Sequence, residues 1–242
     1  MEHGIPSTRL ALAHVHLARK EPTSALEALQ PMESALEKDP RSGTDLWLAL
    51  GQTYQRTGAL TAAERVAARA GKGPAVQQLL KDCRQDRRHL AVFSVEPARE
   101  VAYVDAMRAA QAEVERSRLT KARTLARDVE KRFPGTPGPV LLGCLVEAKA
   151  SSLSRTQAAC TRATTTAPEL IEPHFWLGLV LLQQNRWPEA RAELGKACEL
   201  DEGGDTWWRV AHWYRQANDG KALAELKERY RARFGRELRA DR

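Results

Sequence analysis

Positions that end helices recur along this chain at a fixed interval, and that interval constrains the fold more than any other feature. Pro40, Pro74, Pro134, Pro168 and Glu202 each follow an amphipathic stretch, and their separations are 34, 60, 34 and 34 residues. An interval of about 20 to 50 residues is the signature of an array built from one repeating unit. Because a unit of that size cannot bury its apolar side alone, successive units must stack on one another.

The unit at residues 171–202 shows what is repeated. It reads as two short helices placed back to back. The small residues Gly178 and Ala190 would let the two backbones approach closely, while Leu177 and Leu194 fill the space beside them. The chain is therefore predicted to be all-α and built from helical hairpins.

A second unit carries a more specific pattern. Residues 44–74 run Trp47-x-x-Leu50-Gly51-x-x-Tyr54, followed by Gly58, Leu60, Ala63 and Ala70. This pattern resembles the signature of the tetratricopeptide repeat (TPR) family, whose period is about 34 residues. Residues 171–202 match nearly as well, with His174 where the family prefers Trp and Leu181 where it prefers Tyr. The resemblance implies a right-handed superhelical solenoid of antiparallel helix pairs, whose first helices line a concave groove that binds peptides or protein segments.

Weaker units extend the pattern over most of the chain. Residues 8–40 predict a helix pair whose second helix is about one turn long and carries Pro31. Residues 97–134, 139–168 and 205–235 predict three further pairs, and in the middle one Leu142-Gly143 is taken as the Leu-Gly of the signature.

The 60-residue interval is the one irregularity. It leaves residues 75–100, where a helix to about Leu90 is expected before a crossing segment at 91–95. This stretch is either a degenerate repeat that lacks part of its second helix, or an insertion that marks a break between two stacks. We favour the degenerate repeat, because no Gly/Ser linker separates the halves of the chain. The expected organisation is N-terminal repeats at 1–74, this stretch at 75–100, C-terminal repeats at 101–235 and a polar tail at 236–242.

Two adjacent tryptophans set the register of the last pair. If Trp207 is the packed residue, Val210 and Tyr214 fall into the expected Leu and Tyr places. If Trp208 is packed instead, Arg215 must be buried, which is costly without a partner. The first register is favoured, and it leaves Trp208 facing the groove.

Residues next to the packed stripe, on the side of each first helix that faces the groove, should contact a partner. On the two best-defined first helices these are Phe175, Leu179, Leu182, Trp208, His212 and Arg215. A Trp beside aliphatic residues and an Arg has the composition of an interface hot spot, and an apolar segment, helical or extended, would suit it. The alternative is that a C-terminal helix at 221–234 covers this patch as a cap. TPR domains that clamp a chaperone's C-terminal carboxylates carry a Lys/Asn/Arg set that is missing here, so that ligand is not predicted.

No sequence pattern points to catalysis, a cofactor or a metal. The nucleophile-elbow, Walker, dinucleotide-binding and zinc-protease motifs are absent. His14 and His16 would face apart on a helix, and Cys83 and His89 have no second pair to complete a metal site. We therefore expect a non-enzymatic chain with no cofactor and no metal.

The cysteines and the hydropathy bear on location. Cys83, Cys144, Cys160 and Cys198 lie far apart without a CxxC pair, each in a helical pattern beside Leu or Ala. That setting favours small buried side chains with reduced thiols, and reduced thiols predict a cytoplasmic location. The first residues do not form a secretory-signal pattern, and no apolar stretch is long enough to span a bilayer.

Charge leaves a second function open. The net charge is +7, but acidic residues are interleaved with the basic ones, as is typical of solvated helix faces. Basic clusters occur at Arg84, Arg87 and Arg88, and at Lys227, Arg229, Arg231, Arg233, Arg236 and Arg239. The main hypothesis is an adaptor that binds a protein segment through residues 140–215. Nucleic-acid binding is a less favoured alternative, and an accessory subunit of a secretion, pilus or kinase assembly is a third.

Overall fold

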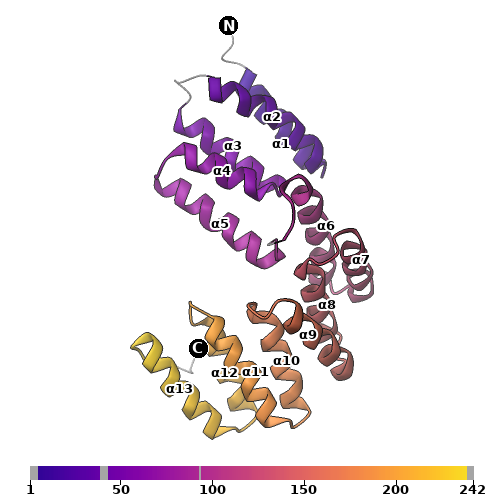
Figure 1. The fold of residues 1–242 in the computed structure, drawn as a ribbon, viewed down its shortest axis with the longest axis vertical. Helices are drawn as coiled ribbons and strands as arrows, with labels where there is room; N and C mark the ends of the chain where they lie inside the picture. The colour runs from indigo at the N-terminus through magenta and orange to yellow at the C-terminus, as the bar shows by residue number, and fades with distance from the viewer. Residues whose placement is uncertain (1–4, 39–42, 93, 239–242) are drawn as a thin grey trace. The chain divides into compact units, whose positions relative to one another are not determined.

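The computed structural model describes residues 5–38, 43–92 and 94–238, and within those ranges every regular element is an α-helix (Figure 1). In order, the helices are α1 (Ile5–Ala18), α2 (Pro22–Lys38), α3 (Thr44–Thr57), α4 (Leu60–Ala70), α5 (Pro74–Leu90), α6 (Pro97–Glu115), α7 (Leu119–Arg132), α8 (Pro137–Lys149), α9 (Leu153–Thr166), α10 (Ile171–Gln183), α11 (Trp187–Leu200), α12 (Asp205–Gln216) and α13 (Gly220–Phe234). The predicted all-α, TPR-like solenoid of antiparallel helix pairs is confirmed.

The chain divides into two compact units. Unit 1 comprises Met1–Arg116 and Arg127–Gly138, and unit 2 comprises Ser117–Ala126 and Pro139–Arg242. Each unit has its own apolar core, in which consecutive helices pack as hairpins. Within the described ranges, no helix combines the length and the apolar character needed to cross a bilayer.

The signature residues of unit 1 do the packing that the pattern predicts. Trp47, Leu50 and Tyr54 of α3 are all buried in the core. Gly51 lies at a close helix approach, since a Cβ atom added there would come within 2.8 Å of the Leu79 side chain on α5. A larger residue at that position would force the Leu79 side chain to shift.

The second helix of the first pair is longer than predicted. Instead of a single turn, α2 runs over seventeen residues with Pro31 inside it. Proline removes one backbone hydrogen bond and crowds the preceding turn. The helix nevertheless continues because Leu29, Met32 and Leu36 form one stripe that is buried against the core. Tertiary burial outweighs the local preference to break.

The irregular stretch between the predicted pairs forms one helix. As expected, α5 ends at Leu90, and Ala91 then adopts a left-handed conformation with φ of 51°. The predicted crossing segment follows, and it includes position 93, which lies outside the described residues. Because α5 packs against both α3 and α4, it extends the stack of unit 1 without a hairpin partner of its own.

Unit 2 contains the close crossing predicted between α10 and α11. A Cβ atom on Gly178 would lie 2.6 Å from Cγ of Leu194, so only glycine fits there. In the preceding pair, a disulfide joins Cys144 of α8 to Cys160 of α9, with the Cα atoms 4.6 Å apart. These two cysteines stand 34 residues before Gly178 and Leu194 respectively, so the disulfide occupies the same crossing one repeat earlier.

This disulfide corrects two predictions. The crossing residue of α8 is Cys144 and not Gly143, at which an added Cβ would have no neighbour within 4 Å. The expectation of four reduced thiols is wrong for Cys144 and Cys160. It holds for Cys83 and Cys198, which are free and buried, and burial raises the pKa of both thiols to about 12.

Candidate protein-binding site

The loop before α12 fixes where that helix begins. The carboxylate of Asp201 accepts hydrogen bonds from the backbone N–H groups of Gly203, Gly204 and Thr206, at 2.8, 3.1 and 2.5 Å. Gly204 adopts a φ of 92°, which glycine reaches without strain. A carboxylate at this end also interacts favourably with the helix dipole. The first turn of α12 is therefore anchored by one buried side chain.

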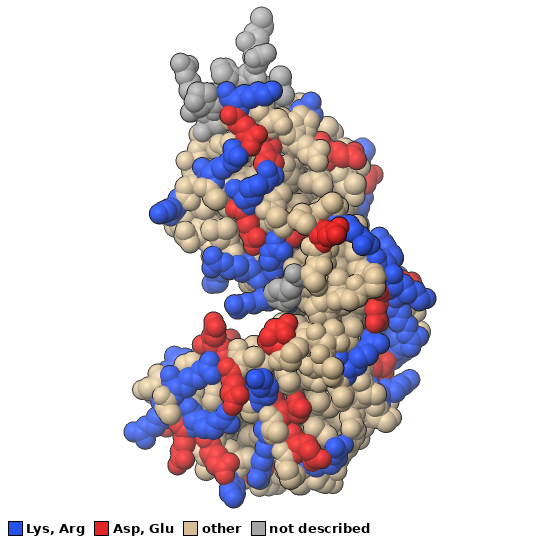
Figure 2. Space-filling model, viewed as in Figure 1, with Lys and Arg blue, Asp and Glu red and all other residues tan. Residues whose placement is uncertain are grey.

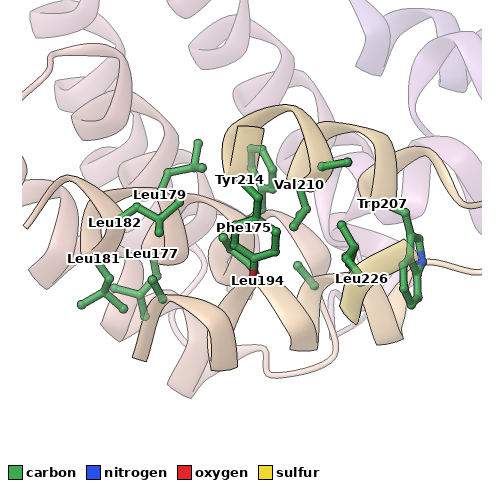
Figure 3. Packing of buried hydrophobic residues seen from close by; sticks show 14 of the residues in the cluster. Phe175, Leu177, Leu179, Leu181, Leu182, Leu194, Trp207, Val210, Tyr214 and Leu226 are labelled. Atoms are coloured by element: carbon green, nitrogen blue, oxygen red, sulfur yellow. The ribbon is translucent and has the colours of Figure 1, made fainter. Parts of the chain in front are cut away.

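One side of α12 is locked into the core of unit 2. Trp207 is only 2% exposed and makes edge-to-face contacts with Tyr230 and Phe234 of α13, with ring centres 5.7 and 6.0 Å apart. Val210 and Tyr214 are buried along the same stripe (Figure 3). The register in which Trp207 is the packed tryptophan is confirmed.

The adjacent side of α12 keeps its access to solvent. Trp208 is half-buried and packs against the edge of the core cluster. His212 and Arg215 are exposed, and the His212 ring stands edge-on to Trp213 at 6.0 Å. These three of the six predicted site residues retain surface with which a partner could make contact.

The other three predicted residues belong to α10 and lie inside the core. Phe175, Leu179 and Leu182 are 2%, 4% and 7% exposed. Figure 3 shows them in the same cluster as the packed residues of α12. Of the three, Phe175 contacts α12 through Arg209. Contact between them and a partner stays a prediction.

One residue of this region was missed at the sequence level. The guanidinium carbon of Arg209 lies 3.8 Å from the centre of the Phe175 ring, so the cation covers the aromatic face. Burial of the guanidinium lowers the pKa of Arg209, although the carboxylates of Glu172 and Asp201 act in the opposite direction. The sequence offered one indication of this. Arg209 stands three residues before His212, so the two residues lie on neighbouring parts of the helix surface.

The C-terminal helix covers Trp207 and not the whole patch. Tyr230 and Phe234 of α13 lie against that ring, while Trp208 keeps part of its surface. Asp219 caps the start of α13 and receives a bidentate pair from Arg191 of α11, with the closest contact at 2.7 Å. Helix α13 thus packs on Trp207, which lies outside the predicted patch, and a cap over the patch itself stays an alternative.

Comparison with known proteins agrees with this geometry. Residues 173–205, from α10 to the start of α12, match the family model of the tetratricopeptide repeat. One tetratricopeptide repeat of this chain is thus identified at residues 173–205. No curated protein matches its sequence.

Among solved structures, this chain is similar in fold to a chain of the APC/C hetero-tetramer Cut9–Hcn1. That likeness has 14% identity and a TM-score of 0.50, and covers 93% of this chain and 46% of the other. It also matches the type IV pilus biogenesis factor PilW, at 12% identity and a TM-score of 0.47, over 98% of this chain and 96% of PilW. At such identities the comparisons show the fold alone.

Each basic cluster of this chain contains an arginine that is paired with an acidic neighbour. Arg87 bonds to Glu64 and Glu100 inside unit 1, and Arg229 pairs with Glu199 in unit 2. Arg239 lies outside the described residues. Figure 2 shows basic and acidic side chains interspersed over the visible surface, with both signs on each unit. The face shown there is mixed in sign, whereas phosphate backbones favour a continuous positive track.

Metal ligands are not gathered in the part of this chain that the structure describes. No group of three His, Cys, Asp or Glu side chains stands close enough to hold an ion there. The two histidines singled out from the sequence have other partners: His14 contacts Thr53 at 3.3 Å, and His16 contacts Glu21 at 2.8 Å.

Proposed function

We propose that this chain is a non-enzymatic adaptor that binds a protein segment on the α12 face, which we define as Trp208, His212 and Arg215. The observation that carries the proposal is the contrast between the two sides of α12. One side is locked into the core through Trp207, whereas the neighbouring side presents a half-buried Trp flanked by exposed His and Arg. A rigid aromatic anchor with polar neighbours is typical of protein-binding hot spots.

The helix below completes the proposed site. Phe175, Leu179 and Leu182 of α10 belong to the same core cluster as the packed side of α12, and we propose that they help to hold the α12 face in place. The apolar surface of Trp208 favours a segment with at least one apolar side chain, presented in a helical or extended form.

Selection of peptides tests the proposal. A phage library of random 12-residue peptides is selected on the full chain, and the enriched peptides are synthesised and titrated. Trp208→Ala should weaken their binding by roughly 30-fold or more, the loss expected for a hot-spot Trp, while the helical signal in circular dichroism stays that of the wild type. Trp187→Ala is the matched control, because Trp187 is also half-buried in unit 2 but lies at the start of α11.

Two results would count against the adaptor. One is a library from which no peptide is enriched. The other is a Trp208→Ala variant that binds the peptides as tightly as wild type. If Trp208→Ala instead melts the helices, Trp208 belongs to the core and the α12 face is misplaced.

The disulfide bears on where this adaptor works. A cytoplasmic location was expected from reduced thiols, and two of the four cysteines are now joined. Disulfides persist mainly in oxidising compartments, so we favour such a compartment for this chain. Cell fractionation followed by alkylation of free thiols distinguishes the two locations.

The alternative functions stay hypotheses. The likeness to PilW concerns the fold and does not favour a pilus role for this chain. Nucleic-acid binding predicts a gel shift that weakens steeply as salt is raised. The ion pairs of Arg87 and Arg229 leave less free charge for such binding than the sequence alone suggested.

A further inference from the structure

Arg209 has no acidic partner in the described ranges, unlike the partly buried arginines of unit 2. Arg191 is held in a bidentate pair by Asp219, and Arg123 pairs with Glu147. In the described part of the chain, Arg209 has neither a hydrogen bond nor an ion pair, and its contact is with the face of Phe175.

The carboxylates nearest to Arg209 are used elsewhere or stand too far away. Asp201 is committed to three backbone N–H groups at the start of α12. Glu172, on the first turn of α10, attracts Arg209 only at long range. Asp205 lies one turn earlier on α12, yet forms no ion pair with Arg209 among the described residues. No carboxylate among the described residues therefore forms an ion pair with Arg209, although Glu172 and Asp201 attract it at longer range.

Stacking on Phe175 also fixes the geometry of the guanidinium. A planar guanidinium that lies on an aromatic face keeps its N–H donors at its edge, where they match the two oxygens of a carboxylate. Partial removal of water strengthens a charge-assisted hydrogen bond at such a place. The buried ring beneath means that Arg209 cannot collapse further into the core.

From this arrangement we infer that Arg209 is the receptor for a carboxylate of the bound protein segment, next to an apolar residue that contacts Trp208. Arg209 and Trp208 are neighbours in sequence, and His212 stands between them on the helix surface, so both contacts fit one short segment. The inference rests on the proposed function and names the chemistry of the partner: an Asp or Glu side chain beside an apolar one.

The test uses synthetic peptides from the selection described above, with amidated C-termini, each made as a Glu/Gln or Asp/Asn matched pair. Wild type should bind the acidic member about 10- to 100-fold more tightly than the amide member, the range for one charge-assisted hydrogen-bonded pair. Arg209→Met, which still covers Phe175 but carries no charge, should remove that difference. Arg186→Met is the matched control, because Arg186 is an exposed arginine of the same unit paired with Glu189, and it should leave the difference intact.

The outcomes separate the two proposals. If the peptides lack acidic residues, or if Arg209→Met leaves the Glu/Gln preference unchanged, the carboxylate receptor is wrong while the adaptor function stands. If no peptide binds, both are wrong. A preference that appears only with a free C-terminus, and disappears on amidation, would assign Arg209 to the chain-terminal carboxylate and overturn the side-chain version.

Discussion

The disulfide between α8 and α9 should contribute a measurable part of the stability of unit 2. The bond closes a loop with a sequence separation of 16 residues. In the chain-entropy model, a loop of about this length stabilises the folded state by about 3 kcal/mol. For a chain of about this size each kcal/mol shifts the melting temperature by about 2–4 °C. Reduction should therefore lower the Tm by about 6–12 °C.

A double variant separates loss of the bond from loss of packing. Cys144→Gly together with Cys160→Leu installs the pair that Gly178 and Leu194 form one repeat later. This variant should keep the hairpin crossing without a crosslink, so its Tm should not respond to reductant. Cys198→Ala is the control for removing a buried thiol, and it should respond to reductant as wild type does.

The assay is thermal melting followed by circular dichroism at 222 nm, with and without reductant, and the mass of the alkylated protein reports the state of the bond. The mass of the alkylated protein must show that the bond is intact in the oxidised sample and broken in the reduced one. If the two samples then melt at the same temperature, the entropic reasoning is refuted. Absence of the bond from protein purified without reductant would refute the pairing itself.

Three further predictions concern single groups. Asp201→Ala removes the acceptor of three backbone N–H groups at the start of α12. It should lower the free energy of unfolding, measured in urea, by about 1–3 kcal/mol. A decrease below about 0.5 kcal/mol would contradict the role of Asp201 as a cap. Burial acts to raise the pKa of Asp219, but its bonds from Arg191 outweigh burial and hold that pKa below its usual value. The resulting stabilisation is present above the unfolded pKa of about 3.9 and is lost as pH falls through the folded pKa, so Asp219→Asn should flatten stability against pH below about pH 4. Because burial raises the pKa of Cys83 and Cys198 to about 12, Ellman's reagent should modify no thiol in the native oxidised protein and two after denaturation.

The parts of the fold that sequence could predict are those fixed by local spacing. Trp207 and Tyr214 fall into the packed stripe because helix periodicity places them on one side, and Gly178 meets Leu194 because both recur at repeat positions. The same reasoning failed for Pro31, where burial of a helix stripe overrides the local tendency of proline to end a helix.

The parts that sequence could not predict depend on contacts between helices. Sequence spacing placed Gly143 at the crossing of α8 with α9, one residue before the correct position. Cys144 was therefore not recognised as the crossing residue, and its bond to Cys160 was not predicted. Arg209 looked like one more solvated charge on a helix, because its contact with Phe175 joins two helices that the sequence does not relate. Spacing along one helix carries no information about which charge lies on which ring.

The anchoring of α12 has a kinetic consequence. With its first turn held by Asp201 and its inner side fixed through Trp207, the helix already has the conformation that a partner would meet. Binding then requires little ordering of the receptor, so the entropic loss falls on the incoming segment alone. Substitutions of Trp208 or Arg209 should accordingly shorten the lifetime of a complex far more than they slow its formation.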